Sequence, residues 1–288
     1  MFSRCQDLFL HHHHDGCLNY KRPSSALFHS TLKQTHSTDN QPTTHLTTMD
    51  ILSRANDALS TNPPTVVIET LSHHGSDFLW AVTAIYILAF LILLTLCFTA
   101  PETNRVFHYL YTISLLVGAT TYYAQASSLG WTAVPHTQTH PHQLFYARYI
   151  NWTISFPSLA LALGLLSGVS WTTIICNIAL TWLWILAYLA AAFTASSYKW
   201  GFFAFGTLAY LILAMSTLNE SREAAAKMGV KRDYVLLATW ANVLWLCYPV
   251  AFAVSDSADV LGVTAGAVFF GVLDVLLMPV LGLGFVVL

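Results

Sequence analysis

The sequence is poor in charged residues. Only 9% of its 288 residues are Asp, Glu, Lys or Arg, whereas about 25% is usual for a soluble domain. Hydrophobic residues make up 55% of the chain, and the 12 Lys and Arg residues form no basic patch that would attract nucleic acid. This composition indicates a lipid bilayer as the main partner and argues against a nucleic-acid partner.

Paired cysteines and common catalytic motifs are also absent. The five cysteines show no CxxC spacing, which argues against a disulfide framework and a cysteine metal site. The sequence contains no HExxH, GxSxG or phosphate-binding glycine motif. We interpret the histidine run at 11–14 and the HxxxHxH pattern of His136, His140 and His142 as polar tail and loop. We therefore expect neither an enzyme nor a metal site.

Residues 1–76 contain no apolar run long enough to cross a bilayer. They are rich in Ser, Thr, His and Asn, and they do not resemble a cleavable signal sequence. We expect this tail to be largely disordered. Met49 is a plausible start, so residues 1–48 are a candidate upstream extension of the gene model.

Seven apolar stretches follow from residue 78 onward. They cover residues 78–98, 106–129, 143–166, 171–193, 200–218, 234–254 and 261–285. About 20 residues of α-helix cross the roughly 30 Å hydrocarbon core of a membrane. The sequence thus predicts an all-α membrane protein with a seven-transmembrane-helix bundle over residues 77–288.

Positive charge is concentrated in two of the predicted joins. Arg105 lies between the first two helices, and Arg222, Lys227, Lys231 and Arg232 lie in the predicted loop 219–233. Cytoplasmic loops carry an excess of Lys and Arg. We therefore expect a cytoplasmic C-terminus and an extracellular or lumenal N-terminus.

Two ionisable residues stand out within the predicted helices, Arg148 in the third and Asp274 in the seventh. Charged groups at membrane depth are costly and are candidates for function. One interpretation is an ion path or counter-ion pair. The other is a buried structural pair in which Tyr248 or Tyr123 donates hydrogen bonds.

Three motifs resemble the microbial (type 1) rhodopsin family across residues 78–288. They are ARYINWTISFP at 147–157, WLCYP at 245–249 and LDV at 273–275. The resemblance implies a retinal pocket in which Asp274 matches the second counter-ion and Arg148 the arginine beneath the chromophore. The pocket positions that it implies are Tyr123, Trp152, Ser155, Phe156, Tyr188, Tyr210, Trp245, Tyr248, Pro249, Phe252 and Met278.

Met278 is the decisive departure from the family pattern. In retinal-binding members, a lysine four residues after the helix-seven aspartate forms the Schiff base, one turn along the same face. A thioether cannot condense with an aldehyde. The other lysines lie in the predicted tail, in loops or at a helix end, at positions 21, 33, 199, 227 and 231. We therefore expect no covalently bound retinal.

The proton path of the family's pumps is altered as well. Asn151 stands at the proton-acceptor position and Ala162 at the donor position, and neither side chain titrates. On the outer side the matching release region offers Asp256 and Asp259, with Gly266 where pumps can carry a glutamate. A light-driven proton pump is therefore not expected.

The vacated pocket has two interpretations. Phe156, Tyr188 and Tyr210 stand where smaller or slimmer residues are expected, so aromatic rings could fill the volume or simply pack the helices. Alternatively, the pocket keeps room for a noncovalent apolar ligand. Pro279 directly after Met278 removes one helical hydrogen bond and favours a kink at this depth.

The missing lysine, together with ARYINW and SSYKWGFFAFG at 196–206, is similar to the fungal opsin-related subgroup that includes heat-shock-protein-30-like proteins. That resemblance implies a stress-associated plasma-membrane protein that is chaperone-like or modulates a membrane partner such as a proton ATPase. Binding of a noncovalent apolar ligand and light-independent ion conduction or transport remain alternatives. An oligomer is compatible with each of these functions.

Overall fold

The computed structural model describes residues 56–64, 67, 69–102, 104–134, 141–258 and 260–287. The chain divides into two compact units, Met1–His45 and Leu46–Leu288. All described residues belong to the second unit. The expected disorder of residues 1–55 and the candidate gene-model extension at 1–48 lie outside the described residues.

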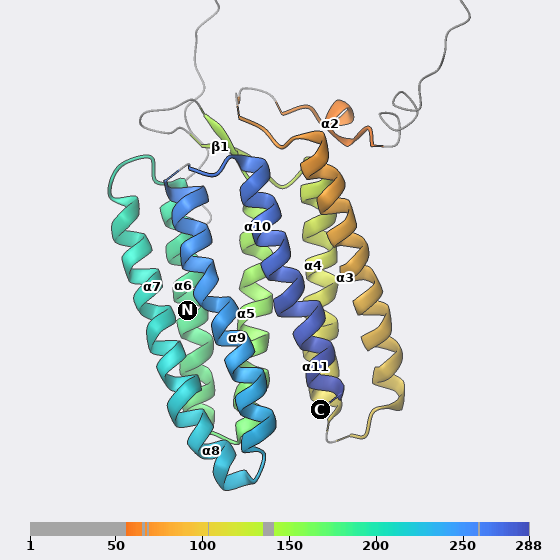
Figure 1. Cartoon of the computed structure of the whole chain (residues 1–288), viewed down its shortest axis with the longest axis vertical. Coiled ribbons are helices and arrows are strands. Elements are labelled where there is room, and N and C mark those ends of the chain that lie inside the picture. Colours follow the sequence, from red (N-terminus) through yellow and green to blue (C-terminus); the bar gives the residue numbers. More distant parts are fainter. Residues whose placement is uncertain are drawn as a thin grey trace, which may run out of the picture. The chain divides into compact units, whose positions relative to one another are not determined.

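Seven long helical spans run side by side in the described part of the second unit (Figure 1). The first four are α3 (His73–Thr99), α4 (Arg105–Ala126), α5 (Tyr146–Ser167) and α6 (Trp171–Phe193). The fifth joins α7 (Lys199–Met215), the π-helix η1 (Ser216–Glu220) and α8 (Ser221–Met228). The sixth joins α9 (Lys231–Phe252) and η2 (Ala253–Ser257), and the seventh joins α10 (Val263–Val275), η3 (Leu276–Val280) and α11 (Leu281–Val287).

Six of these spans are long and apolar enough to cross a bilayer. The remaining span, α4, has 22 residues but carries buried polar side chains such as Ser114, Thr121 and Gln125. These side chains donate to carbonyl groups of α4 itself, so their polar atoms are satisfied inside the bundle. The predicted seven-helix fold is confirmed.

The fifth span extends beyond its predicted end. Residues 219–228, predicted to be loop, are helical, and only Gly229 and Val230 separate α8 from α9. The sequence SREAAAKM is rich in strong helix formers, with Glu223 in the first turn and Lys227 in the last, where each favours the helix dipole. Gly229 ends the helix with φ of 83°.

A short antiparallel hairpin replaces part of the predicted loop between α4 and α5. Strand β1 (Thr132–Val134) pairs with β2 (His142–Leu144), so α5 begins at Tyr146 rather than at the predicted residue 143. His142 is therefore a buried strand residue and not part of a polar loop. His136 and His140 lie outside the described residues.

The sequence predicts a disordered tail that reaches residue 76, whereas the described part of residues 56–76 is ordered against the bundle. Their described part forms the short helix α2 (Ala58–Thr61) and contacts the bundle. The Asn62 side chain donates to the Ser127 carbonyl at 2.9 Å, and the Leu71 backbone N–H donates to the Gln143 side chain at 2.9 Å. These long-range hydrogen bonds fix the segment to the helix ends.

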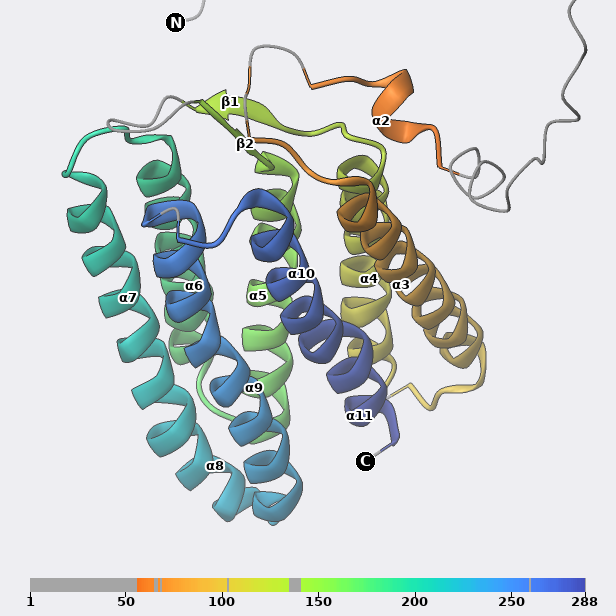
Figure 2. The same ribbon diagram turned by 45° about the horizontal axis from the view of Figure 1, so that its top comes forward.

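The two ends of the bundle are formed by different elements. At one, Asn104, Leu166, Val230 and Phe285 line one cavity, so the α3–α4 join, the α8–α9 join and the end of α11 lie together. We call it the α8 end. The opposite end carries β1, β2 and the start of α3, and we call it the hairpin end (Figure 1, Figure 2).

Candidate functional site

Asp274 on α10 is the centre of a buried polar cluster. Its side chain is buried, and its Oδ1 atom accepts from the Tyr248 hydroxyl at 2.5 Å and from the Trp152 indole at 3.0 Å. Its Oδ2 atom accepts from Tyr122 at 2.5 Å and from the Asn151 amide at 3.2 Å. We call these five residues the Asp274 cluster. Because four donors converge on one carboxyl group, its acceptor sites are saturated.

Tyr122, and not the predicted Tyr123, faces the interior. Tyr123 is 52% exposed and packs edge to face against Trp80, with ring centroids 5.4 Å apart. The buried residues Tyr111 and Leu115 share the interior face of α4 with Tyr122. Spacings of four and seven residues place these three on one face of a helix, so this signal was present in the sequence.

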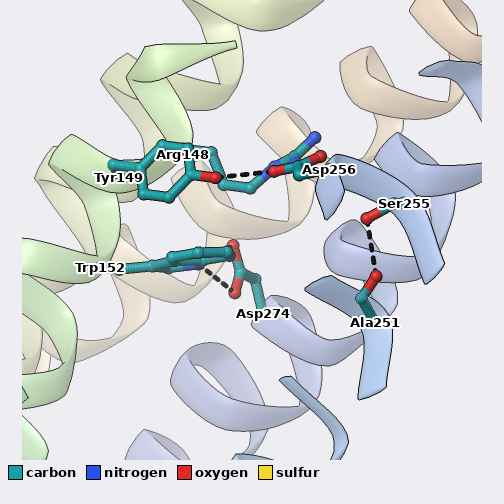
Figure 3. Close-up of polar contacts among 7 residues, drawn as sticks. All are labelled: Arg148, Tyr149, Trp152, Ala251, Ser255, Asp256 and Asp274. Carbon is teal, nitrogen blue, oxygen red and sulfur yellow. Dashed lines mark hydrogen bonds and ion pairs between the residues drawn. The ribbon is translucent and has the colours of Figure 1, made fainter. Parts of the chain in front are cut away.

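The sequence suggested that Arg148 pairs with Asp274. In the structure, Arg148 pairs with Asp256 instead. Its Nη1 atom lies 3.2 Å from Oδ2 of Asp256, and the side chains are 4% and 11% exposed. The Tyr149 hydroxyl donates to the same carboxyl oxygen at 2.7 Å. Figure 3 shows this contact and the Trp152–Asp274 contact as two separate groups of side chains.

Two features of the structure explain why Arg148 pairs with Asp256 rather than with Asp274. The oxygens of Asp274 already accept from four neutral donors, whereas Asp256 is brought over Arg148 by η2, beyond the predicted helix end at 254. The guanidinium carbon also lies 4.2 Å from the centre of the Phe270 ring, a cation–π contact. Arg148 therefore belongs to the hairpin-end side of the site.

Melting curves of variants test this pairing. Arg148→Gln and Asp256→Asn should each lower stability in detergent, and the double variant should lose less than the sum, with a coupling energy of about 1–3 kcal/mol. The matched cycle of Arg148→Gln with Asp274→Asn should show a smaller coupling energy. Larger coupling with Asp274 than with Asp256 would overturn this assignment.

Aromatic rings occupy the interior beside the Asp274 cluster. Phe156 stacks on Trp152 with centroids 5.9 Å apart and contacts Trp245 at 6.0 Å. It also meets Tyr248 edge to face at 5.0 Å. The resemblance matches Trp152, Trp245, Tyr248 and Pro249 to the residues that sandwich the polyene. The Phe156 ring contacts three of these four residues, Trp152, Trp245 and Tyr248.

The other predicted aromatic positions continue the same packing. Tyr188 stacks on Phe252 with centroids 4.3 Å apart, and its hydroxyl is 2.8 Å from that of Thr207. Tyr210 packs against Trp184 at 4.9 Å. Trp184 had not been singled out, although it contacts Phe156 at 5.2 Å. Together these rings form a continuous buried wall from α5 to α7 and α9.

Met278 lies in η3 and is 1% exposed. The π-helix includes Pro279 within a continuous helical span, and Trp240 donates to the Leu276 carbonyl at 3.1 Å. A widened turn of this kind accommodates the missing N–H of proline. The three described lysines, Lys199, Lys227 and Lys231, lie at helix ends.

The remaining predicted positions are buried but make local contacts. Ser155 donates to the Asn151 carbonyl at 2.9 Å, and Pro249 lies inside α9. Ala162 is buried against the helices that surround α5. Tyr86 had not been singled out, and its hydroxyl donates to the Asp274 backbone carbonyl at 3.0 Å. Neither Asn151 nor Ala162, the positions that the resemblance matches to the proton acceptor and donor, carries a titrating side chain.

Comparisons with known proteins show similarity to one family of membrane proteins. Residues 74–285 match the family described as bacteriorhodopsin-like protein. The chain is 35% identical over 248 residues to the opsin-like protein carO of Fusarium fujikuroi, covering 81% of this chain and 80% of that protein. It is 26% identical over 255 residues to the 30 kDa heat shock protein of Saccharomyces cerevisiae, covering 79% and 76%.

A solved structure gives the same fold. The light-driven proton pump of Leptosphaeria maculans superposes with a TM-score of 0.72 at 29% identity, covering 77% of this chain and 96% of that one. The family match extends over all seven spans described above. The chain therefore belongs to the bacteriorhodopsin-like family of seven-helix membrane proteins, with fungal opsin-related and heat-shock proteins among its relatives.

Proposed function

We propose that the protein is a non-photoactive member of its family that binds no retinal covalently and acts in the stress response or on another membrane protein. The observation that carries this proposal is Met278, a buried thioether one turn after Asp274. Schiff-base formation needs an amine, and this position offers none.

The closed interior supports the same function. Phe156 contacts both Trp152 and Trp245, and Asp274 is saturated by hydroxyl, indole and amide donors rather than facing a cation. In this arrangement the former counter-ion serves to connect α4, α5, α9 and α10. The filled interior favours a structural or interaction role over an interior apolar ligand.

The stress association rests on the relatives. One of them is named a 30 kDa heat shock protein. The resemblance to heat-shock-protein-30-like proteins favours the plasma membrane. We orient the α8 end toward the cytoplasm, because Arg105, Arg222, Lys227 and Lys231 lie at that end. The exposed charged face of α8 is available there to a membrane-protein partner such as a proton ATPase.

Independence from light is the testable core of this function. Cells of the native host that lack the protein should show altered stress survival and plasma-membrane proton-ATPase activity. The unmodified protein and Met278→Leu should restore both equally, in darkness or light and with or without retinal, because neither side chain carries an amine. A restoration that requires light or added retinal would contradict the proposal.

A further inference from the structure

A cleft of about 290 Å³ opens between α6 and the α7–η1 segment, outside the closed interior. The two helices lie side by side in both views (Figure 1, Figure 2). Residues from the first half of α6 and from the end of α7 line it, so it lies toward the α8 end. The lining residues that matter here are Thr173, Asn177, Leu180, Ile212, Ser216 and Glu220.

Asn177 is the unusual member of this lining. It is 1% exposed, and neither its Nδ2 nor its Oδ1 atom has a hydrogen-bond partner in the described part of the chain. The Oγ atom of Ser216 across the cleft is likewise buried and unpartnered among those residues. A buried amide without a partner is costly, and more so at membrane depth. The cleft is thus lined by side chains whose donor and acceptor atoms have no partner among the described residues.

The π-helix η1 explains why the cleft is open. Its inner side is fixed to α9, because the Tyr234 hydroxyl donates to the Thr217 carbonyl at 2.7 Å and the Asn242 amide donates to the Thr217 hydroxyl at 3.1 Å. The neighbouring Ser216 and Glu220 line the cleft toward α6. π-Helical turns of this kind occur frequently at functional sites.

The chemistry of the lining selects the ligand. Glu220 is the one charged residue among the described residues that line the cleft, and its carboxylate accepts from the Thr173 hydroxyl at 2.8 Å. No Lys or Arg is among these lining residues. This lack of positive charge disfavours a phosphate headgroup. Leu180 and Ile212 supply an apolar wall, and Ile212 is 47% exposed on the outer surface. Asn177 lies six residues, or about 9 Å, along α6 from Trp171.

We propose that this cleft binds a membrane sterol, whose single hydroxyl exchanges hydrogen bonds with the Asn177 amide and the Ser216 hydroxyl. A hydroxyl both donates and accepts, as these two side chains require. A sterol has no other polar group, and its rigid apolar body fits the wall of Leu180 and Ile212. Diacylglycerol would bring two ester groups for which this lining offers no further buried donors.

Photolabelling tests the proposal on the full chain in lipid nanodiscs. A diazirine-bearing sterol should label peptides of α6 and η1, and unlabelled sterol should compete, whereas diacylglycerol and phosphatidylcholine should not. Asn177→Leu should weaken competition about tenfold, as expected for one or two lost hydrogen bonds, and Ser216→Ala should weaken it less. Thr120→Val removes an exposed hydroxyl from α4 that bonds its own helix, and it should leave labelling unchanged.

Melting in sterol-free detergent separates binding from folding. Asn177→Leu should melt no lower than the unmodified protein, because it removes an unpartnered amide, and added sterol should stabilise the unmodified protein and Thr120→Val but not Asn177→Leu. Even labelling of all lipid-facing helices, equal competition by diacylglycerol, or unchanged labelling of Asn177→Leu would overturn the proposal. A lower melting temperature of sterol-free Asn177→Leu would do so too, since the amide would then be satisfied within the protein.

Discussion

Asp274→Ala should lower the stability of the protein by about 3–5 kcal/mol, because three or more buried donors lose their acceptor at once, and each unsatisfied donor costs about 1–3 kcal/mol before local relaxation. The donors are the hydroxyls of Tyr122 and Tyr248, the Trp152 indole and the Asn151 amide. They come from three different helices, so the effect should appear in global unfolding. Thermal or denaturant unfolding in detergent measures it.

Two variants control this experiment. Asp274→Asn keeps one acceptor oxygen and should lose less than Asp274→Ala. Asp256→Ala removes a carboxylate that is 11% exposed and interacts mainly with Arg148 and Tyr149, so it should also lose less. If Asp274→Ala costs under about 1 kcal/mol, which is the value of a single ordinary hydrogen bond, the Asp274 cluster does not hold the helices together.

The second large effect concerns the filled interior. Met278→Lys supplies the missing amine beside Asp274, yet it should form little pigment with all-trans retinal, because the Phe156 ring packs against both Trp152 and Trp245. Met278→Lys combined with Phe156→Ala should form a visible pigment, since both the amine and the space are then present. Absorption spectra after addition of retinal measure the difference.

A matched double variant controls for loss of a ring in general. Met278→Lys with Phe205→Ala removes a phenylalanine that is 67% exposed, and it should behave like Met278→Lys alone. Strong pigment formation by Met278→Lys alone would show that the aromatic residues do not close the interior. The missing lysine would then be the only barrier to retinal.

Much of the fold could be predicted because apolar length is a strong signal. The fourth span was predicted to the residue, and the others within about ten residues at each end. The largest error, at 219–228, arose because this part of the helix is polar and has no apolar run to reveal it. The hairpin was missed because each of its strands has only three residues.

The site could be predicted only where motifs and helix faces suffice. Trp152, Phe156, Trp245 and Tyr248 follow from the motifs, and Met278 from its spacing after Asp274. Trp152 and Tyr248 belong to the Asp274 cluster, Phe156 contacts both, and Trp245 and Met278 are buried. The partner of Arg148 could not be predicted. It depends on the π-helical extension of α9, which positions Asp256, and on which side chains of other helices donate hydrogen bonds to Asp274. Neither follows from the spacing of residues along one helix.

The spectrum of the unmodified protein in the presence of all-trans retinal tests the central claim most directly. Purified protein should show only the absorption of free retinal, and borohydride reduction followed by mass spectrometry should find no lysine-linked adduct, because Met278 occupies the Schiff-base position and the described lysines lie at helix ends. A stable red-shifted band together with a reduced retinyl-lysine peptide would contradict the account.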